Sequence, residues 1–167
     1  MRSYRGGPVQ HYHEVAQVCL NGHIITDRYD SSPQLRKNFC SICGAKTIHQ
    51  CPNCGENIQG DYIVPHVVLG GLSSTPAYCH NCGAAFPWTE RRLEAVRQLA
   101  LETEELGEEK EELVNSLPDL VSDTPGTPMA AKRWKKALEK LGGHSASALK
   151  EMIVQVASET AKKLLFP

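Results

Sequence analysis

Two hydrophobic patterns divide the chain. Before residue 89, short β-prone runs lie at 15–18, 24–26 and 46–48, with turn-forming residues between them, and the strongest apolar segment, 63–72, contains Pro65, Gly70 and Gly71. Runs of this length favour strands over helices. From residue 89 onward, apolar residues recur every three or four positions, which is the helical period. The pattern therefore predicts a small α+β protein, in which short β-hairpins precede an α-helical tail.

Three helices are expected in the tail. The first begins at Thr89, a favourable N-cap that Glu90 follows in the first turn, and it runs to about residue 107. The second covers 128–141 and has one apolar stripe beside a basic face. The third covers 146–165 and is apolar around more than half of its circumference. A helix of that kind needs substantial cover from other segments.

All seven cysteines lie between residues 19 and 82, with the spacing of metal ligands. Three C-x-x-C-G motifs begin at Cys40, Cys51 and Cys79, and a C-L-N-G-H motif from Cys19 to His23 precedes them. Each motif offers two ligands, and structural zinc takes four Cys or His ligands. The eight ligands therefore predict two complete zinc sites, the mark of a tandem zinc ribbon.

The four ligand pairs can be combined in two ways. Interleaved pairing, as in RING-type domains, would join the first pair to the third. We favour sequential pairing, because the seven residues between the second and third pairs leave room for a connection between two separate sites. Site 1 is then Cys19, His23, Cys40 and Cys43, and site 2 is Cys51, Cys54, Cys79 and Cys82. His66 and His80 are expected to be non-ligands, because both sets are full.

Zinc is the expected metal, with two ions per chain. Iron in site 2 is an alternative, because four cysteines also form a rubredoxin-like ligand set. Disulfides are disfavoured, because the first 15 residues contain no apolar run that would indicate a signal peptide. We expect a cytoplasmic protein with metal-bound thiols. No membrane span is expected, because charged residues interrupt the apolar pattern of the last helix.

The motifs, taken together with the helical tail, resemble a small bacterial family of unknown function with an N-terminal zinc ribbon. The resemblance is carried by Y12-H-E, C19-L-N-G-H23, F39-C40-x-x-C43-G44 and C51-P-x-C54-G55. It covers roughly residues 12 to 90, and its most specific part is the C-L-N-G-H opening. It implies zinc binding and a bacterial cytosolic setting, and it implies no known reaction.

Charge is unevenly distributed along a chain whose net charge is only −1. Residues 89–125 carry four basic and eleven acidic side chains, whereas 126–167 carry eight basic and three acidic ones. These parts could attract each other within a chain or between copies. The expected divisions are a disordered lead at 1–11, a tandem zinc-ribbon domain at 12–88, an acidic helical segment at 89–117, a linker at 118–127 and a C-terminal helical hairpin at 128–167.

Three functions are compatible with these features. We favour a non-catalytic adaptor that acts through protein–protein interaction. A nucleic-acid-binding ribbon is the alternative, although such proteins usually combine a dense basic patch with aromatic residues, and residues 1–88 carry six basic against five acidic side chains. A zinc enzyme is less favoured, because a catalytic zinc keeps an open position and both predicted sites are full.

The last helix supplies the expected docking surface. The 146–165 helix has a wide apolar stripe, and the two helices of the predicted hairpin cannot cover it by themselves. The cover must come from the 90–106 helix, the ribbon or another chain. We therefore expect self-association or a protein partner at this stripe. The candidate partner-binding residues are Leu149, Met152, Ile153 and Val156.

Overall fold

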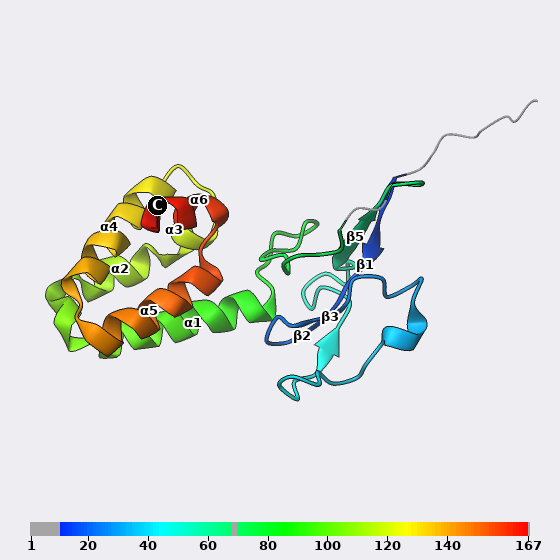
Figure 1. Ribbon diagram of the computed structural model, residues 1–167, viewed down its shortest axis with the longest axis horizontal. Coiled ribbons are helices and arrows are strands. Elements are labelled where there is room, and N and C mark those ends of the chain that lie inside the picture. Colours follow the sequence, from blue (N-terminus) through cyan, green and yellow to red (C-terminus); the bar gives the residue numbers. More distant parts are fainter. Residues whose placement is uncertain (1–10, 68–69, 167) are drawn as a thin grey trace, which may run out of the picture. The chain divides into compact units, whose positions relative to one another are not determined.

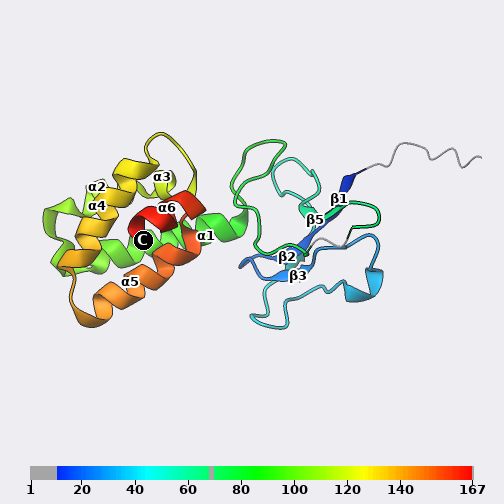
Figure 2. The same ribbon diagram turned by 45° about the horizontal axis from the view of Figure 1, so that its top comes forward.

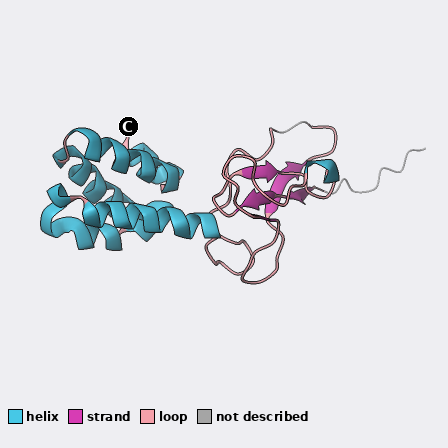
Figure 3. Cartoon of the chain, turned by 90° about the horizontal axis from the view of Figure 1, so that it is seen from below, coloured by secondary structure: helices cyan, strands magenta, loops and turns pink. Residues whose placement is uncertain are grey.

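The computed structural model describes residues 11–67 and 70–166 and divides into two units, Met1–Trp88 and Thr89–Pro167 (Figure 1). The first unit contains short strands and long loops, and the second contains helices (Figure 3). The predicted α+β class is therefore confirmed. All but the last residue of the expected disordered lead at 1–11 lies outside the described residues.

Two small antiparallel sheets build the first unit (Figure 1). Strand β1 (Tyr12–Val15) pairs with β5 (Gln59–Ile63). Strand β2 (Gln17–Cys19) lies between β3 (Ile24–Thr26) and β4 (Thr47–Ile48). Because β2 is the central strand, all three of its residues are buried.

The core of the first unit is small and partly made of predicted metal ligands. Trp88 anchors it, since its ring stacks on Phe86 at 4.6 Å and its Nε1 donates to the Pro76 carbonyl at 2.8 Å. A core of this size rarely stabilises a fold without metal or disulfides. Its buried members are Ala16, Val18, Cys51, Ile58, Cys79, Phe86 and Trp88.

The long loop after β3 is held by specific polar contacts. Arg28 donates to the buried carboxylate of Asp61 at 2.6 Å, which ties the loop to β5. Arg36 lies 4.0 Å above the ring of Tyr29 and also donates to its carbonyl at 2.8 Å. The loop includes one short 3-10 helix, η1 (Pro33–Leu35).

Helices alone form the second unit (Figure 2). Trp134 is fully buried at its centre and donates from Nε1 to Ser116 Oγ at 3.1 Å. Across the described residues, no helix combines the length and the apolar character needed to cross a bilayer. The elements are α1 (Pro87–Glu102), η2 (Glu104–Glu109), α2 (Lys110–Asn115), α3 (Leu117–Val121), α4 (Thr127–Lys140), α5 (Gly143–Val156) and α6 (Glu159–Leu165).

Helix boundaries differ from the expected ones at two places. Helix α1 ends at Glu102, because the backbone becomes extended at Thr103, where ψ is 101°, and the chain turns again at Gly107, where φ is +58°. The expected linker at 118–127 is wrong in its first part, because α3 occupies it and buries Leu120.

The expected long last helix is also wrong, because it is two helices. Ala157 and Ser158 have extended backbones, with ψ of 141° and 162°. Ser158 Oγ accepts from the Ala161 N–H at 3.2 Å and so caps α6, while the Ser158 N–H donates to the Leu120 carbonyl. The C-terminal part is therefore three helices and not a hairpin.

The expected docking stripe is buried inside the second unit. Leu149 and Ile153 have no solvent exposure, and Met152 and Val156 pack partly buried against the same core. The cover comes from the chain itself, because this core also contains residues of the short helices η2, α2 and α3. The prediction that these four residues form an accessible partner surface is therefore wrong for this fold.

Candidate metal centres

Three C-x-x-C-G turns in the first unit have the same backbone structure. We call these three turns, and the C-L-N-G-H turn that precedes them, knuckles, and we number the four in chain order. In the second knuckle (40–44), the Cys40 N–H donates to the Ala45 carbonyl at 2.8 Å and the Gly44 N–H donates to the Cys40 carbonyl at 2.9 Å. The third (51–55) and fourth (79–83) knuckles repeat both bonds. The repeated bonds point the two thiols of each turn the same way.

Glycine closes each of these turns for a conformational reason. Gly44, Gly55 and Gly83 have φ of +69°, +76° and +71°. A side chain disfavours this left-handed region, whereas glycine enters it without a steric penalty. The motif therefore requires its fifth residue to be glycine.

The first knuckle (19–23) reaches a similar shape with one more residue. Its Cys19 N–H donates to the His23 carbonyl at 3.0 Å, and Gly22 supplies the positive φ of +87°. The His23 N–H donates in turn to Cys19 Sγ at 3.2 Å. This closure places an imidazole where the other knuckles place their second thiol.

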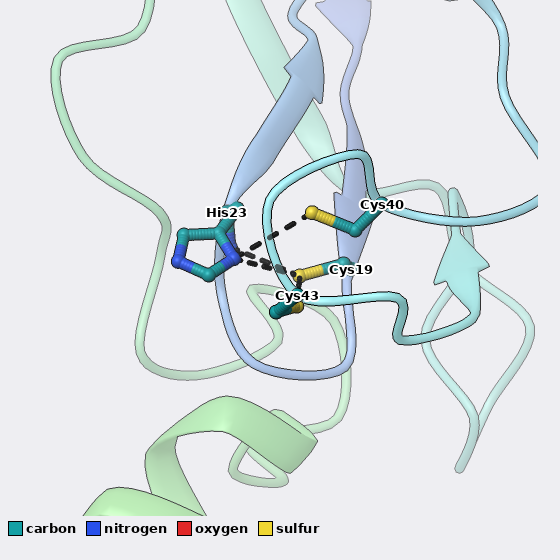
Figure 4. Close-up of side chains that lie close together, drawn as sticks. All are labelled: Cys19, His23, Cys40 and Cys43. Carbon is teal, nitrogen blue, oxygen red and sulfur yellow. Dashed lines mark hydrogen bonds between the residues drawn. The ribbon is translucent and has the colours of Figure 1, made fainter.

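Site 1 brings together the four predicted ligands (Figure 4). His23 Nδ1 lies 3.4 Å from Cys19 Sγ and 3.6 Å from Cys40 Sγ, and Cys19 Sγ lies 3.7 Å from Cys43 Sγ. A tetrahedral zinc ion with Zn–S of about 2.3 Å and Zn–N of about 2.0–2.1 Å separates its ligands by roughly 3.8 Å (S···S) and roughly 3.6 Å (S···N). The donor atoms of site 1 therefore fit a tetrahedral metal ion.

Site 2 has the same dimensions with four sulfurs. Cys51 Sγ lies 3.8 Å from Cys82 Sγ, and Cys54 Sγ lies 3.7 Å from Cys79 Sγ. In each site all donor atoms lie within 4.8 Å of one another. The grouping is sequential, first pair with second and third with fourth, and not interleaved. Neither His66 nor His80 belongs to the two clusters found among the described residues.

Three asparagines donate to the sulfurs across the sites. Asn21 Nδ2 donates to Cys43 Sγ at 3.4 Å, Asn53 to Cys82 at 3.4 Å, and Asn81 to Cys54 at 3.6 Å. Each asparagine immediately follows the first spacer residue of its motif, and each reaches the last ligand of the opposite knuckle. This role was not predicted from the sequence, although asparagine occupies the same position in L-N-G-H, P-N-C and H-N-C.

The family described as "Uncharacterized protein conserved in bacteria (DUF2321)" matches residues 12–165. The chain belongs to this family. The match confirms the resemblance inferred from the motifs, and it spans the helical unit as well as the ribbon. No curated protein and no solved structure matches the chain.

The two thiols of a knuckle differ in burial. The first cysteine is buried in every pair, whereas the second cysteine, at Cys43, Cys54 and Cys82, is exposed. Burial raises the pKa of Cys19, since it penalises the charged thiolate. Each site of this family member therefore has an inner and an outer side.

One outer thiol in each site is set up as a thiolate. The Ala45 backbone N–H, helped by the Asn21 amide, lowers the pKa of Cys43 to about 6. The Asn53 amide, followed by the Ala84 backbone N–H, lowers the pKa of Cys82 to about 6. Hydrogen bonds to the charged form favour it, and the thiolate is the form that binds metal. Both sites can therefore begin to bind a cation at neutral pH.

Proposed function

We propose that the protein is a non-catalytic adaptor, in which two structural zinc ions hold a rigid ribbon that binds another protein. The observation that carries this proposal is the completeness of both ligand sets. Four protein donors surround each centre, and asparagine amides donate hydrogen bonds to three of the sulfurs. A catalytic zinc keeps a position for water or substrate, and these sites supply all four ligands themselves.

Zinc is the proposed metal at both centres, and the cytoplasm is the proposed location. Mixed Cys₃His and Cys₄ sets are those of structural zinc, and a reducing compartment keeps such thiols available. Iron in site 2 is the competing assignment. Elemental analysis of protein purified without added metal should give two zinc atoms per chain. One atom per chain, or a red iron-containing protein, contradicts this part of the proposal.

Protein is favoured over nucleic acid as the partner class by the charges of the ribbon. Residues 11–88 carry four basic and five acidic side chains. Arg28 is paired with Asp61 and Arg36 is stacked on Tyr29, so both are already engaged. On the basic helix α4 the aromatic residue, Trp134, is fully buried. Nucleic-acid-binding surfaces usually combine a dense basic patch with several exposed aromatics, whereas the two remaining cations of the ribbon, Lys37 and Lys46, lie beside one exposed aromatic residue, Phe39.

The test compares zinc-loaded full-length protein with zinc-stripped protein as bait in a nuclease-treated lysate of the encoding bacterium. We expect the same few proteins to be enriched by the zinc-loaded form in repeated captures, and purified partners to bind it directly. A parallel capture from untreated lysate tests the alternative: recovery of nucleic acid there, with an affinity that falls steeply as salt is raised, and of no protein from the nuclease-treated lysate contradicts the adaptor function.

A further inference from the structure

The second knuckle departs from the pattern of the other three. Asn21, Asn53 and Asn81 each donate to the last ligand of the opposite knuckle. At the same position the second knuckle has Ile42. By the same rule this residue would face His23, and a neutral imidazole ligand carries no thiolate charge that needs an amide donor. The side chain at position 42 is therefore not needed as a hydrogen-bond donor to a metal ligand.

Position 42 of the second knuckle carries an exposed apolar side chain, and so does position 39. Ile42 is 73% exposed and Phe39 is 63% exposed, the two highest values among the large hydrophobic residues that the structure describes. The residue equivalent to Phe39 is Gln50 in the third knuckle, where the same backbone bridge occurs. Neither apolar side chain is needed for the shared turn, because the third knuckle forms it without them.

Free positive charge lies beside these two residues. Lys46 is the bridge partner of Phe39, so both side chains lie on the same face of the turn. Lys37, two residues before Phe39, is also exposed. Among the described residues, neither lysine side chain has a hydrogen bond or an ion pair. The residues equivalent to Lys46 in the third and fourth knuckles are the uncharged Asn57 and Ala85.

We infer that Lys37, Phe39, Ile42 and Lys46, the knuckle patch, dock an acidic peptide segment of a partner protein. Apolar side chains of that segment cover Phe39 and Ile42, and its carboxylates pair with the two lysines. Charge complementarity selects an acidic segment, and the branched aliphatic Ile42 favours a protein over a stacked base. The inference rests on the proposed function and adds the surface and the chemistry of its partner.

The chain supplies its own substitutions for the test. The knuckle variant carries Phe39→Gln and Ile42→Asn. It has at these two positions the residues of the third knuckle, so it should fold and keep both metals. Leu35→Gln is the matched control, because Leu35 is 48% exposed in the same unit but lies outside the knuckle patch. Lys37→Glu with Lys46→Glu reverses the charge without removing the apolar pair.

The probe is a phage-displayed random peptide library selected on the immobilised zinc-loaded protein. We expect enrichment of peptides that combine Asp or Glu with apolar residues. A synthetic peptide from that selection should bind the knuckle variant at least about tenfold more weakly, which is typical for loss of a central apolar contact. It should bind the Leu35→Gln control unchanged and the charge-reversed variant more weakly.

Four results overturn the inference, and the last of them leaves the adaptor function intact. The first is a selection without acidic–apolar enrichment, or equal peptide binding by wild type and knuckle variant. The second is binding of oligothymidine that the knuckle variant loses, since it reassigns the patch to nucleic acid. The third is loss of zinc from the knuckle variant, since it gives Ile42 a role in the site. If the knuckle variant still captures the lysate partners, the docking surface is wrong and the adaptor function stands.

Discussion

Asn53 lowers the proton affinity of the sulfur that it contacts, Cys82 Sγ. The Asn53 amide is the main reason that the pKa of Cys82 is lowered to about 6. Below that pH the metal-free thiol is protonated, so a metal must displace a proton to bind. The amide favours the bound thiolate over the free thiol, and this benefit fades at higher pH, where the free group is a thiolate as well.

Replacing Asn53 by alanine should weaken zinc binding at site 2 by about 10–100-fold, the usual cost of losing a hydrogen bond to a ligand. The loss should be full below pH 6, should shrink as the pH rises from 6 to the ordinary thiol pKa, and should vanish above it, because the free group is then a thiolate with or without the amide. Competition with a zinc chelator over a pH series measures it. Gln50→Ala is the control, because Gln50 donates to Asn57 and not to a sulfur. A pH-independent effect would disprove the proton-competition argument.

Replacing His23 by alanine should remove one of the four donors of site 1 and leave three thiols. After dialysis against a weak chelator, the zinc content should fall from two atoms to about one per chain, since the Cys₄ set of site 2 is untouched. His66→Ala and His80→Ala should retain both atoms, because neither histidine belongs to a cluster. Equal metal loss in all three variants would contradict the ligand set.

The helices of the second unit are stabilised mainly by one shared apolar core. In α5, Ile153 is fully buried while its neighbour Val154 is 38% exposed. Short elements contribute cover as well, since Leu106, Leu113 and Leu120 come from η2, α2 and α3. The stripe of α5 is therefore satisfied within the chain.

Ile153→Ala should lower the free energy of unfolding of the helical unit by about 2–5 kcal/mol, because it deletes buried apolar atoms and leaves a cavity. Urea denaturation followed by far-UV circular dichroism measures the change. Val154→Ala, one residue along the same helix, should cost no more than about 0.5 kcal/mol. Zinc content should remain the same in both. Similar costs for the two variants would place Ile153 at the surface.

The two units of the molecule have separate cores of different kinds. The ribbon core has seven buried members, and two of them, Cys51 and Cys79, are predicted ligands. The helical core has seventeen buried members and includes no cysteine. Metal should therefore be essential for one core and irrelevant to the other.

Stripping the metal with a strong chelator should unfold the ribbon and spare the helices. Limited proteolysis should then cut within 11–88, while a fragment close to 89–167 survives and the helical circular dichroism persists. Adding zinc in excess of the chelator should restore protection of the ribbon. Loss of helical signal on chelation would show that the second core depends on the metal.

The sequence predicted the fold class and the composition of the ligand clusters, because both depend on short, local patterns. A C-x-x-C-G turn forms from its own hydrogen bonds, so its spacing is enough to identify it. The break between α5 and α6 was not predicted, because Ala157 and Ala161 keep the helical spacing of apolar residues on both sides of Ser158. Helix α3 was not predicted either, because Pro118 and the prolines that follow it are typical of a linker. The burial of Leu120 that stabilises this helix depends on tertiary contacts and cannot be read from the local sequence.

The division of each site into an inner and an outer side bears on how fast a metal ion bound there would exchange. Cys54 and Cys82 reach solvent, whereas Cys51 and Cys79 do not. A competing ligand can therefore displace the outer thiolates one at a time, without prior opening of the ribbon. The rate of metal transfer should then rise with the concentration of the acceptor, and the lifetime of the bound ion would be set by its surroundings more than by the unfolding rate of the protein.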